Sequence, residues 1–232
     1  MYPEGWSNTD FHDYQYNGIS IFLYAVTMRR FYAHSLDNEP EWRWQPLKEH
    51  LLNTAKLAEQ FAHAFGADLT ARIAGLLHDL GKYADQFQRR LRNPLHEQAK
   101  DHSTAGVAAI LNCYKYKAEV AALAVEGHHI GLKRIRANSG SRRSWENWFR
   151  QIADSVQQYS GSFTESDFQL LVQRFRSNGL HFPEMEDQGF ADLLHDENAA
   201  AAAMLDVRML FSALVDDDFI DTEAHFHSSV DQ

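Results

Sequence analysis

The chain has few of the residues and segments that mark several classes of protein. Cys113 is the only cysteine among 232 residues, so an internal disulfide and a cysteine-rich zinc site are excluded and a reducing compartment is favoured. Proline is also scarce, with 5 residues, whereas hydrophobic residues make up 44% of the chain. This balance predicts a packed globular core, and we expect a cytoplasmic protein.

Long apolar segments are equally scarce. The nearest candidate, residues 19–28, is too short to cross a bilayer and is interpreted as a buried helix or strand. No positively charged and then apolar leader with a cleavage signal opens the chain. We therefore expect no membrane partner.

The net charge of −10 is not typical of a general nucleic-acid-binding protein, because such proteins are usually basic. A basic cluster nevertheless follows the His128-His129 doublet. A basic loop beside a metal site is well placed to contact phosphate. The cluster contains Lys133, Arg134, Arg142 and Arg143, which we take as candidate nucleic-acid contacts, together with Arg136 and Arg150.

Alanine-rich and leucine-rich stretches dominate and alternating strand patterns are rare, which predicts an all-α fold. Pro46 and Gly66 mark the start and the stop of the first clear helix, and Gly81 is expected to end the next one. Further helices are expected from residue 101 or 103 to 111, and over 118–129, 165–177 and 198–220, with a long loop over 131–147. The apolar side of the last helix is expected to contain Leu205, Met209, Ser212, Ala213 and Phe219.

Histidines and acids form separated groups along this helical pattern. His78-Asp79 ends an apolar helical stretch and is followed at once by a glycine and Lys82. One carboxylate can bind two metal ions through its two oxygens, and histidine supplies a nitrogen donor. A single histidine is more often a core residue than a ligand, but a doublet near a helix end can direct both rings at one centre. The remaining groups are His50, His102, His128-His129 and the acids Asp216–Asp218.

The order of these groups resembles the HD phosphohydrolase superfamily. More closely, it is similar to the HD nuclease domain of the type I CRISPR-associated helicase-nuclease, over roughly residues 30–223. The stretches that carry the likeness are Tyr32-Ala33-His34-Ser35, Trp44 with Pro46-Leu47 and His50-Leu51, Gly75 to Lys82 with Phe87-Gln88, Asp101 to Gly106, Arg208 to Ser212, Asp216 to Phe219, and Asp221 to Glu223.

The resemblance implies two metal sites that share Asp79 and bind divalent transition metal ions, namely manganese, nickel, cobalt or iron. The first set of ligands would be His50, His78, Asp79 and a C-terminal aspartate, and the second would be Asp79, His102, His128 and His129. We choose Asp218 as the C-terminal ligand because the aromatic Phe219 follows it, with Asp216 as the alternative. The resemblance also gives Asp79 and Lys82 catalytic roles, whereas His34 is not an expected ligand.

The same resemblance implies an HD-domain helical bundle over residues 31–223, with residues 1–30 as an extension packed on the core and 224–232 as a tail or the start of a linker. The implied function is a single-stranded DNA nuclease of CRISPR interference, an endonuclease with a candidate 3′-to-5′ exonuclease activity. Its implied partners are a helicase, in cis or in trans, and a guide-RNA surveillance complex. Two alternatives remain open, an HD-type nucleotide phosphohydrolase and a non-catalytic HD interaction module.

Overall fold

The computed structural model describes residues 30–97, 101–132, 165–185 and 200–230. Contacts divide the chain into one unit over Met1–Arg30 and a second over Phe31–Gln232. The predicted N-terminal extension and most of the predicted basic loop therefore lie outside the described residues. All of the elements below belong to the second unit.

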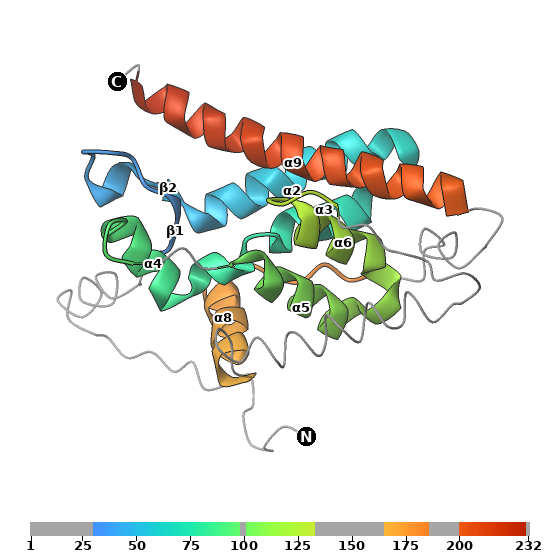
Figure 1. Ribbon diagram of the computed structural model, residues 1–232, viewed down its shortest axis with the longest axis horizontal. Coiled ribbons are helices and arrows are strands. Elements are labelled where there is room, and N and C mark those ends of the chain that lie inside the picture. Colours follow the sequence, from blue (N-terminus) through green and yellow to red (C-terminus); the bar gives the residue numbers. More distant parts are fainter. Residues whose placement is uncertain (1–29, 98–100, 133–164, 186–199, 231–232) are drawn as a thin grey trace, which may run out of the picture. The chain divides into compact units, whose positions relative to one another are not determined.

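The described part of the chain is mostly helical, which confirms the predicted all-α class (Figure 1). Two short strands form an antiparallel pair ahead of the α-helices, with one 3-10 helix between them, and three further 3-10 helices connect α-helices. The strands are β1 (Tyr32–His34) and β2 (Gln45–Pro46), and the 3-10 helices are η1 (Glu41–Arg43), η2 (His63–Phe65), η3 (Leu80–Tyr83) and η4 (Lys115–Ala118). The α-helices are α2 (Leu47–Ala62), α3 (Asp68–Leu77), α4 (Asp85–Arg92), α5 (Ser103–Tyr114), α6 (Glu119–Gly127), α8 (Glu165–Ser177) and α9 (Ala200–Val230).

Helix α2 begins directly after Pro46, as predicted, and η2 continues it to Gly66, which adopts a left-handed conformation with φ 72°. The buried side chains of α2 recur at helical spacing and pack on α3. The two helices approach so closely that a Cβ added to Gly75 would lie 2.7 Å from the Cα of Ala55. This close packing brings the first turn of α2 near the C-terminal end of α3.

The predicted role of Gly81 as the end of this helix is wrong. Helix α3 ends at Leu77, and Gly81 lies within η3. Its backbone N–H donates to the carbonyl oxygen of His102 (3.1 Å), and a Cβ at position 81 would collide with the backbone of His102. Glycine is therefore required here by the close approach of the segment that leads into α5.

Helix α9 packs along α2 and α6 and is longer than predicted (Figure 1). The predicted apolar side is wrong, because Leu205, Met209 and Phe219 are 58%, 37% and 62% exposed, and Ser212 is also exposed. Of the predicted set, only Ala213 is buried. The buried face instead contains Val207, Leu210, Ala213, Leu214, Asp217 and Asp221. Two acids thus occupy the face that a hydrophobic pattern would assign to apolar residues.

Candidate metal centre

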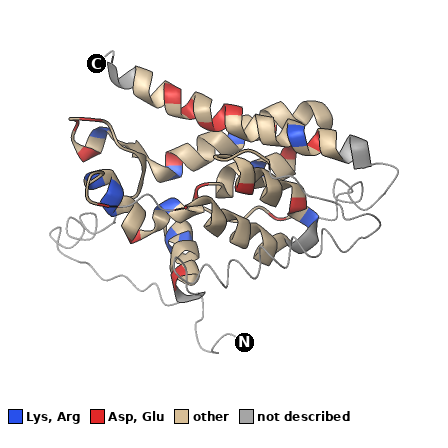
Figure 2. Ribbon diagram, in the orientation of Figure 1, with Lys and Arg blue, Asp and Glu red and all other residues tan. Residues whose placement is uncertain are grey.

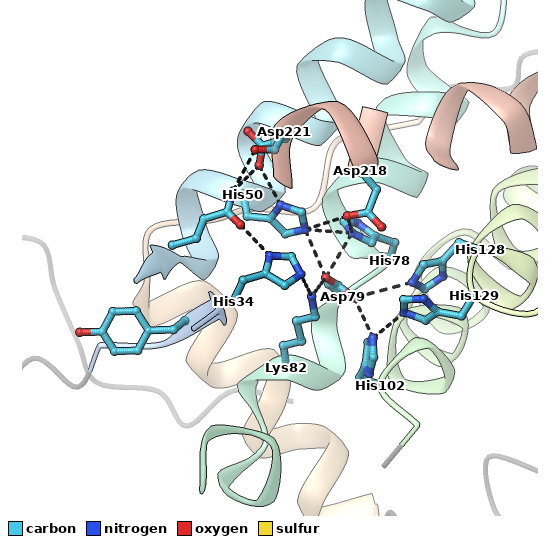
Figure 3. A network of polar contacts seen from close by, with 12 residues as sticks. His34, His50, His78, Asp79, Lys82, His102, His128, His129, Asp218 and Asp221 are labelled. Atoms are coloured by element: carbon cyan, nitrogen blue, oxygen red, sulfur yellow. Dashed lines mark hydrogen bonds and ion pairs between the residues drawn. The ribbon is translucent and has the colours of Figure 1, made fainter. Parts of the chain in front are cut away.

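The predicted ligands converge from distant parts of the chain at one place (Figure 3). His50 lies in the first turn of α2, and His78 and Asp79 lie between α3 and η3. The other ligands come from the start of α5, from the end of α6 and from α9. They are His102, His128, His129 and Asp218.

The first cluster surrounds the ring nitrogens of two fully buried histidines. His50 Nε2 lies 3.2 Å from His78 Nε2, 3.2 Å from Asp79 Oδ2 and 3.3 Å from Asp218 Oδ1. His78 Nε2 lies 3.3 Å from the same Asp79 oxygen. The four ligand atoms all lie within 4.8 Å of one another, a spacing that suits a single metal ion.

The second cluster uses the other oxygen of Asp79. Asp79 Oδ1 lies 3.3 Å from His102 Nε2 and 3.7 Å from His128 Nε2. His129 Nε2 lies 2.6 Å from His102 Nε2, and these four ligand atoms also lie within 4.8 Å of one another. Asp79 is therefore the member common to both clusters, one carboxylate oxygen facing each.

Hydrogen bonds at the far side of three rings direct their Nε2 atoms into the clusters. His78 Nδ1 donates to the Gly75 carbonyl oxygen (2.8 Å), and His128 Nδ1 donates to the Val125 carbonyl oxygen (2.6 Å). His50 Nδ1 donates to Asp221 Oδ2 (2.8 Å). In a neutral imidazole with hydrogen on Nδ1, Nε2 carries a free lone pair. This is the arrangement that metal-binding histidines adopt.

Two buried atoms test whether the residues fit a cation. Asp79 Oδ1 and His128 Nε2 are shielded from solvent, and neither has a hydrogen-bond partner among the described residues. Leaving buried polar atoms unpaired costs about 1–3 kcal/mol each, so such atoms mark a missing partner. Because both are lone-pair donors in the second cluster, a divalent cation satisfies both, and the residues fit the predicted metal.

The pKa shifts in the first cluster indicate that negative charge is concentrated there. Burial lowers the pKa of His50, but hydrogen bonds to Asp218, Asp221 and Asp79 outweigh it and raise the pKa to about 9. Burial likewise opposes charge on His78, but Asp79 and Asp218 raise its pKa to about 10. Burial would raise the pKa of Asp79, yet the charges of His78 and Lys82 hold it well below the usual range. Positive charge is therefore favoured here, whether it is carried by protons or by metal ions.

The raised pKa values predict opposite pH trends for the metal-free fold and for metal binding. Protons on His50 and His78 stabilise the metal-free fold fully below about pH 6.5, and this stabilisation is lost as pH rises through about 9 and 10. Metal ions displace the same protons, so metal affinity rises with pH, by about tenfold per pH unit for each proton released. Urea unfolding of metal-free protein and Mn²⁺ titration at about pH 7 and pH 9 measure the two trends. Equal Mn²⁺ affinity at both pH values would contradict this prediction.

Lys82 lies inside the site rather than on the surface. It is buried, and its Nζ lies 2.5 Å from Asp79 Oδ2 and 3.1 Å from His34 Nε2. The alternative C-terminal ligand, Asp216, is exposed on α9, whereas Asp218 reaches the first cluster. Asp217 between them is fully buried, and burial together with Asp216 raises its pKa to about 7.

Three contributors to the site were not predicted from the sequence, namely His34, Gln45 and Asp221. Asp221 accepts hydrogen bonds from His50 and Gln45, and also from Asn53 Nδ2 (2.8 Å). Burial and the positive charge of Lys82 lower the pKa of His34 to about 4. Signals for two of them were present in the sequence. His34 and Asp221 lie in stretches that carry the family resemblance, and Asp218 and Asp221 are three residues apart and so share a helix face.

The predicted nucleic-acid contacts Lys133, Arg134, Arg142 and Arg143 lie outside the described residues. Their role therefore stays a prediction. Among the described residues, no helix combines the length and the apolar character needed to cross a bilayer.

Comparison with known families agrees with the site. Residues 47–158 match the family model described as HD domain, a range that includes every predicted ligand except Asp218. The match supports the predicted resemblance to the HD phosphohydrolase superfamily, whose members are generally metal-dependent hydrolases. No curated protein matches the chain. The match to the HD domain favours metal-dependent phosphohydrolase chemistry, and the paired clusters agree with metal binding.

Proposed function

We propose that this protein is a metal-dependent phosphodiesterase that cleaves single-stranded DNA in CRISPR interference. The observation that carries the proposal is the pair of four-ligand clusters joined by Asp79. A shared carboxylate would hold two ions close together, and a pair of ions supplies the chemistry suited to in-line displacement at phosphorus. The sequence motifs on both sides of each ligand favour the nuclease over other HD hydrolases.

When bound, two divalent ions supply Lewis-acid stabilisation of a phosphodiester under attack and a nucleophile at neutral pH. The protein's own residues hold and orient these ions. Asp79 joins the two clusters, and the backbone carbonyls of Gly75 and Val125 fix the rings of His78 and His128. Lys82 places a cationic amine beside Asp79, where it can offset charge that develops on the phosphate.

Among the described residues, the side of the site that carries His129 is the more open one for an approaching substrate. His50 and His78 are fully buried, whereas His129 is exposed and the side chains of His102 and Asp218 are 17% and 21% exposed. Lys133 follows His129 by four residues, and a chain of that length spans at most about 14 Å. The predicted basic loop thus follows His129 closely in the sequence, and a basic loop at this point of the chain supports a polymeric anion as substrate.

The acidic balance of the chain supports delivery of the DNA by other proteins. Acidic side chains recur along α9, and the net charge is −10 (Figure 2). Such a protein repels free DNA on average, and a few local cations give only weak binding. We therefore propose that a helicase, in cis or in trans, presents a single strand that a guide-RNA surveillance complex has exposed.

Charge reversal in the basic loop distinguishes a nuclease from a nucleotide phosphohydrolase. The Arg142→Glu, Arg143→Glu double variant is expected to reduce Mn²⁺-dependent cleavage of single-stranded DNA by roughly tenfold or more, because phosphate contacts dominate binding of nucleic acid. Hydrolysis of the small diester bis(p-nitrophenyl) phosphate should be unchanged. Both rates are measured with manganese, nickel, cobalt and iron in turn.

Arg72→Glu provides the matched control, since Arg72 is an exposed cation on α3 that is not part of the clusters. This variant should cleave DNA like the unaltered chain. Efficient hydrolysis of nucleotides without DNA cleavage under any of the four ions would favour the nucleotide phosphohydrolase. Absence of bound metal, with no activity after metal is added back, would favour a non-catalytic module.

A further inference from the structure

We propose that Gln45 and His34, anchored on Asp221, form a positioning relay that aims the amine of Lys82 at Asp79. The consequence for turnover rests on the proposed phosphodiesterase function. The relay itself rests on hydrogen bonds among buried side chains. Its two middle members come from the short strands β1 and β2, which no predicted ligand occupies.

The direction of each hydrogen bond follows from the chemistry of its partners. A carboxylate only accepts, so the Gln45 amide presents its N–H group to Asp221 Oδ2 (2.7 Å). Its carbonyl oxygen then faces His34, and His34 Nδ1 must donate to it (2.7 Å). With hydrogen on Nδ1, the neutral ring leaves a lone pair on Nε2.

The contact between His34 and Lys82 requires the same tautomer of His34. A lysine ammonium only donates, so His34 Nε2 must accept from Lys82 Nζ (3.1 Å). Both neighbours of His34 thus require the neutral form with hydrogen on Nδ1. The amine of Lys82 is held by His34 on one side and by Asp79 Oδ2, at 2.5 Å, on the other. Figure 3 shows His34 and Lys82 directed toward each other beside Asp79.

The relay is connected to the first metal cluster through His50. Asp221 Oδ2 accepts from His50 Nδ1 as well as from Gln45, and His50 Nε2 lies 3.2 Å from Asp79 Oδ2. One carboxylate therefore anchors the hydrogen bond at His50 Nδ1 directly and the one at His34 Nδ1 through Gln45. The result is a closed ring of polar contacts in which His50 alone joins Asp79 to Asp221 on one side and the relay with Lys82 joins them on the other.

Gln88 holds the strand that carries His34 against η3. Its side-chain oxygen accepts from the Tyr32 backbone N–H (3.1 Å), and its Nε2 donates to the carbonyl oxygens of Tyr32 (2.9 Å) and Lys82 (2.8 Å). The backbone on both sides of the His34–Lys82 contact is thereby fixed. This rigidity suits a positioning role, because about 1 Å of misplacement can cost on the order of 100-fold in rate.

Nuclear magnetic resonance of the imidazole nitrogens tests the relay without metal or turnover. In the full-length, metal-free protein, His34 should show hydrogen on Nδ1 and a bare Nε2, its signals being assigned by their absence from His34→Gln. In Gln45→Leu, which removes the acceptor for Nδ1, the Nδ1 signal should shift, whereas Nε2 should stay bare because Lys82 still donates to it. A ring with hydrogen on Nε2 in the unaltered chain would overturn the relay.

Kinetics then test whether the relay acts through Lys82. His34→Ala should lower kcat by about 10- to 100-fold while KM and the number of bound Mn²⁺ ions stay constant. His34→Gln should recover part of the loss, because its amide oxygen can accept from Lys82. Glu39→Gln, in the connection between the two strands, is the matched control and should leave kcat unchanged.

A double-mutant cycle separates positioning from general structural damage. If His34 acts only by orienting Lys82, His34→Ala should have no further effect in a Lys82→Ala background. Additive losses would overturn the proposal. If the unaltered chain hydrolyses no phosphodiester, the proposed function fails, and the spectrum of His34 alone decides whether the relay exists.

Discussion

Asp79→Asn is expected to abolish metal-dependent hydrolysis, with a loss on the order of 10³-fold or more. Asp79 is 1% exposed and supplies one oxygen to each cluster, so Asp79→Asn removes a ligand atom from one cluster and the shared negative charge from both. The amide preserves size but replaces one oxygen by a nitrogen that cannot bind a cation. Two-ion stabilisation supplies several kcal/mol to the transition state, and each 1.4 kcal/mol corresponds to about tenfold in rate.

The measurement is the initial rate of single-stranded DNA cleavage in Mn²⁺, with bound metal determined on the same samples. Asp216→Asn is the matched control, because Asp216 is an exposed carboxylate on α9 outside both clusters. We expect the control to keep full activity and both ions. An Asp79→Asn variant that retained a rate within about tenfold of the unaltered chain would show that the shared carboxylate is not central.

Divalent metal is expected to stabilise the fold strongly. The clusters assemble ligands that lie as far apart in the sequence as His50 and Asp218, so the unfolded chain offers no comparable site. A ligand at 100 times its dissociation constant stabilises the folded state by about 2.7 kcal/mol per site. For a domain of this size 1 kcal/mol shifts the melting temperature by about 2–4 °C, so two sites predict a rise of about 10–20 °C.

Thermal unfolding in Mn²⁺ and in excess chelator measures this rise. The variant His102→Ala removes a ligand from the second cluster alone and should keep roughly half of the gain. Asp79→Asn should keep little of it. Identical melting temperatures with and without metal in the unaltered chain would contradict the assignment of these residues as ligands.

The sequence was most informative where local chemistry determines structure. Pro46 and Gly66 bracket α2 and its 3-10 extension as predicted, because proline and glycine act through their own backbone conformations. The all-α class followed from composition and periodicity, and the match of residues 47–158 to the HD domain supports the predicted superfamily. These features depend on neighbouring residues or on a known pattern of motifs.

The sequence was least informative where distant segments meet. The sequence around Gly81 is typical of a helix end. The structure instead requires glycine there because the backbone of His102 approaches too closely for a side chain. The face of α9 was wrongly predicted because Asp217 and Asp221 are buried there, whereas Leu205 and Phe219 are exposed. The hydrogen bond between Gln45 and Asp221 joins residues 176 positions apart, so no local sequence pattern predicts it.

The most direct test of the central claim is anomalous X-ray diffraction from crystals of the protein grown or soaked with Mn²⁺. We predict two anomalous peaks, one on each side of the Asp79 carboxylate. The first should be bound by His50, His78 and Asp218, and the second by His102, His128 and His129. Peaks only at positions remote from Asp79, with these side chains binding no metal, would contradict the account.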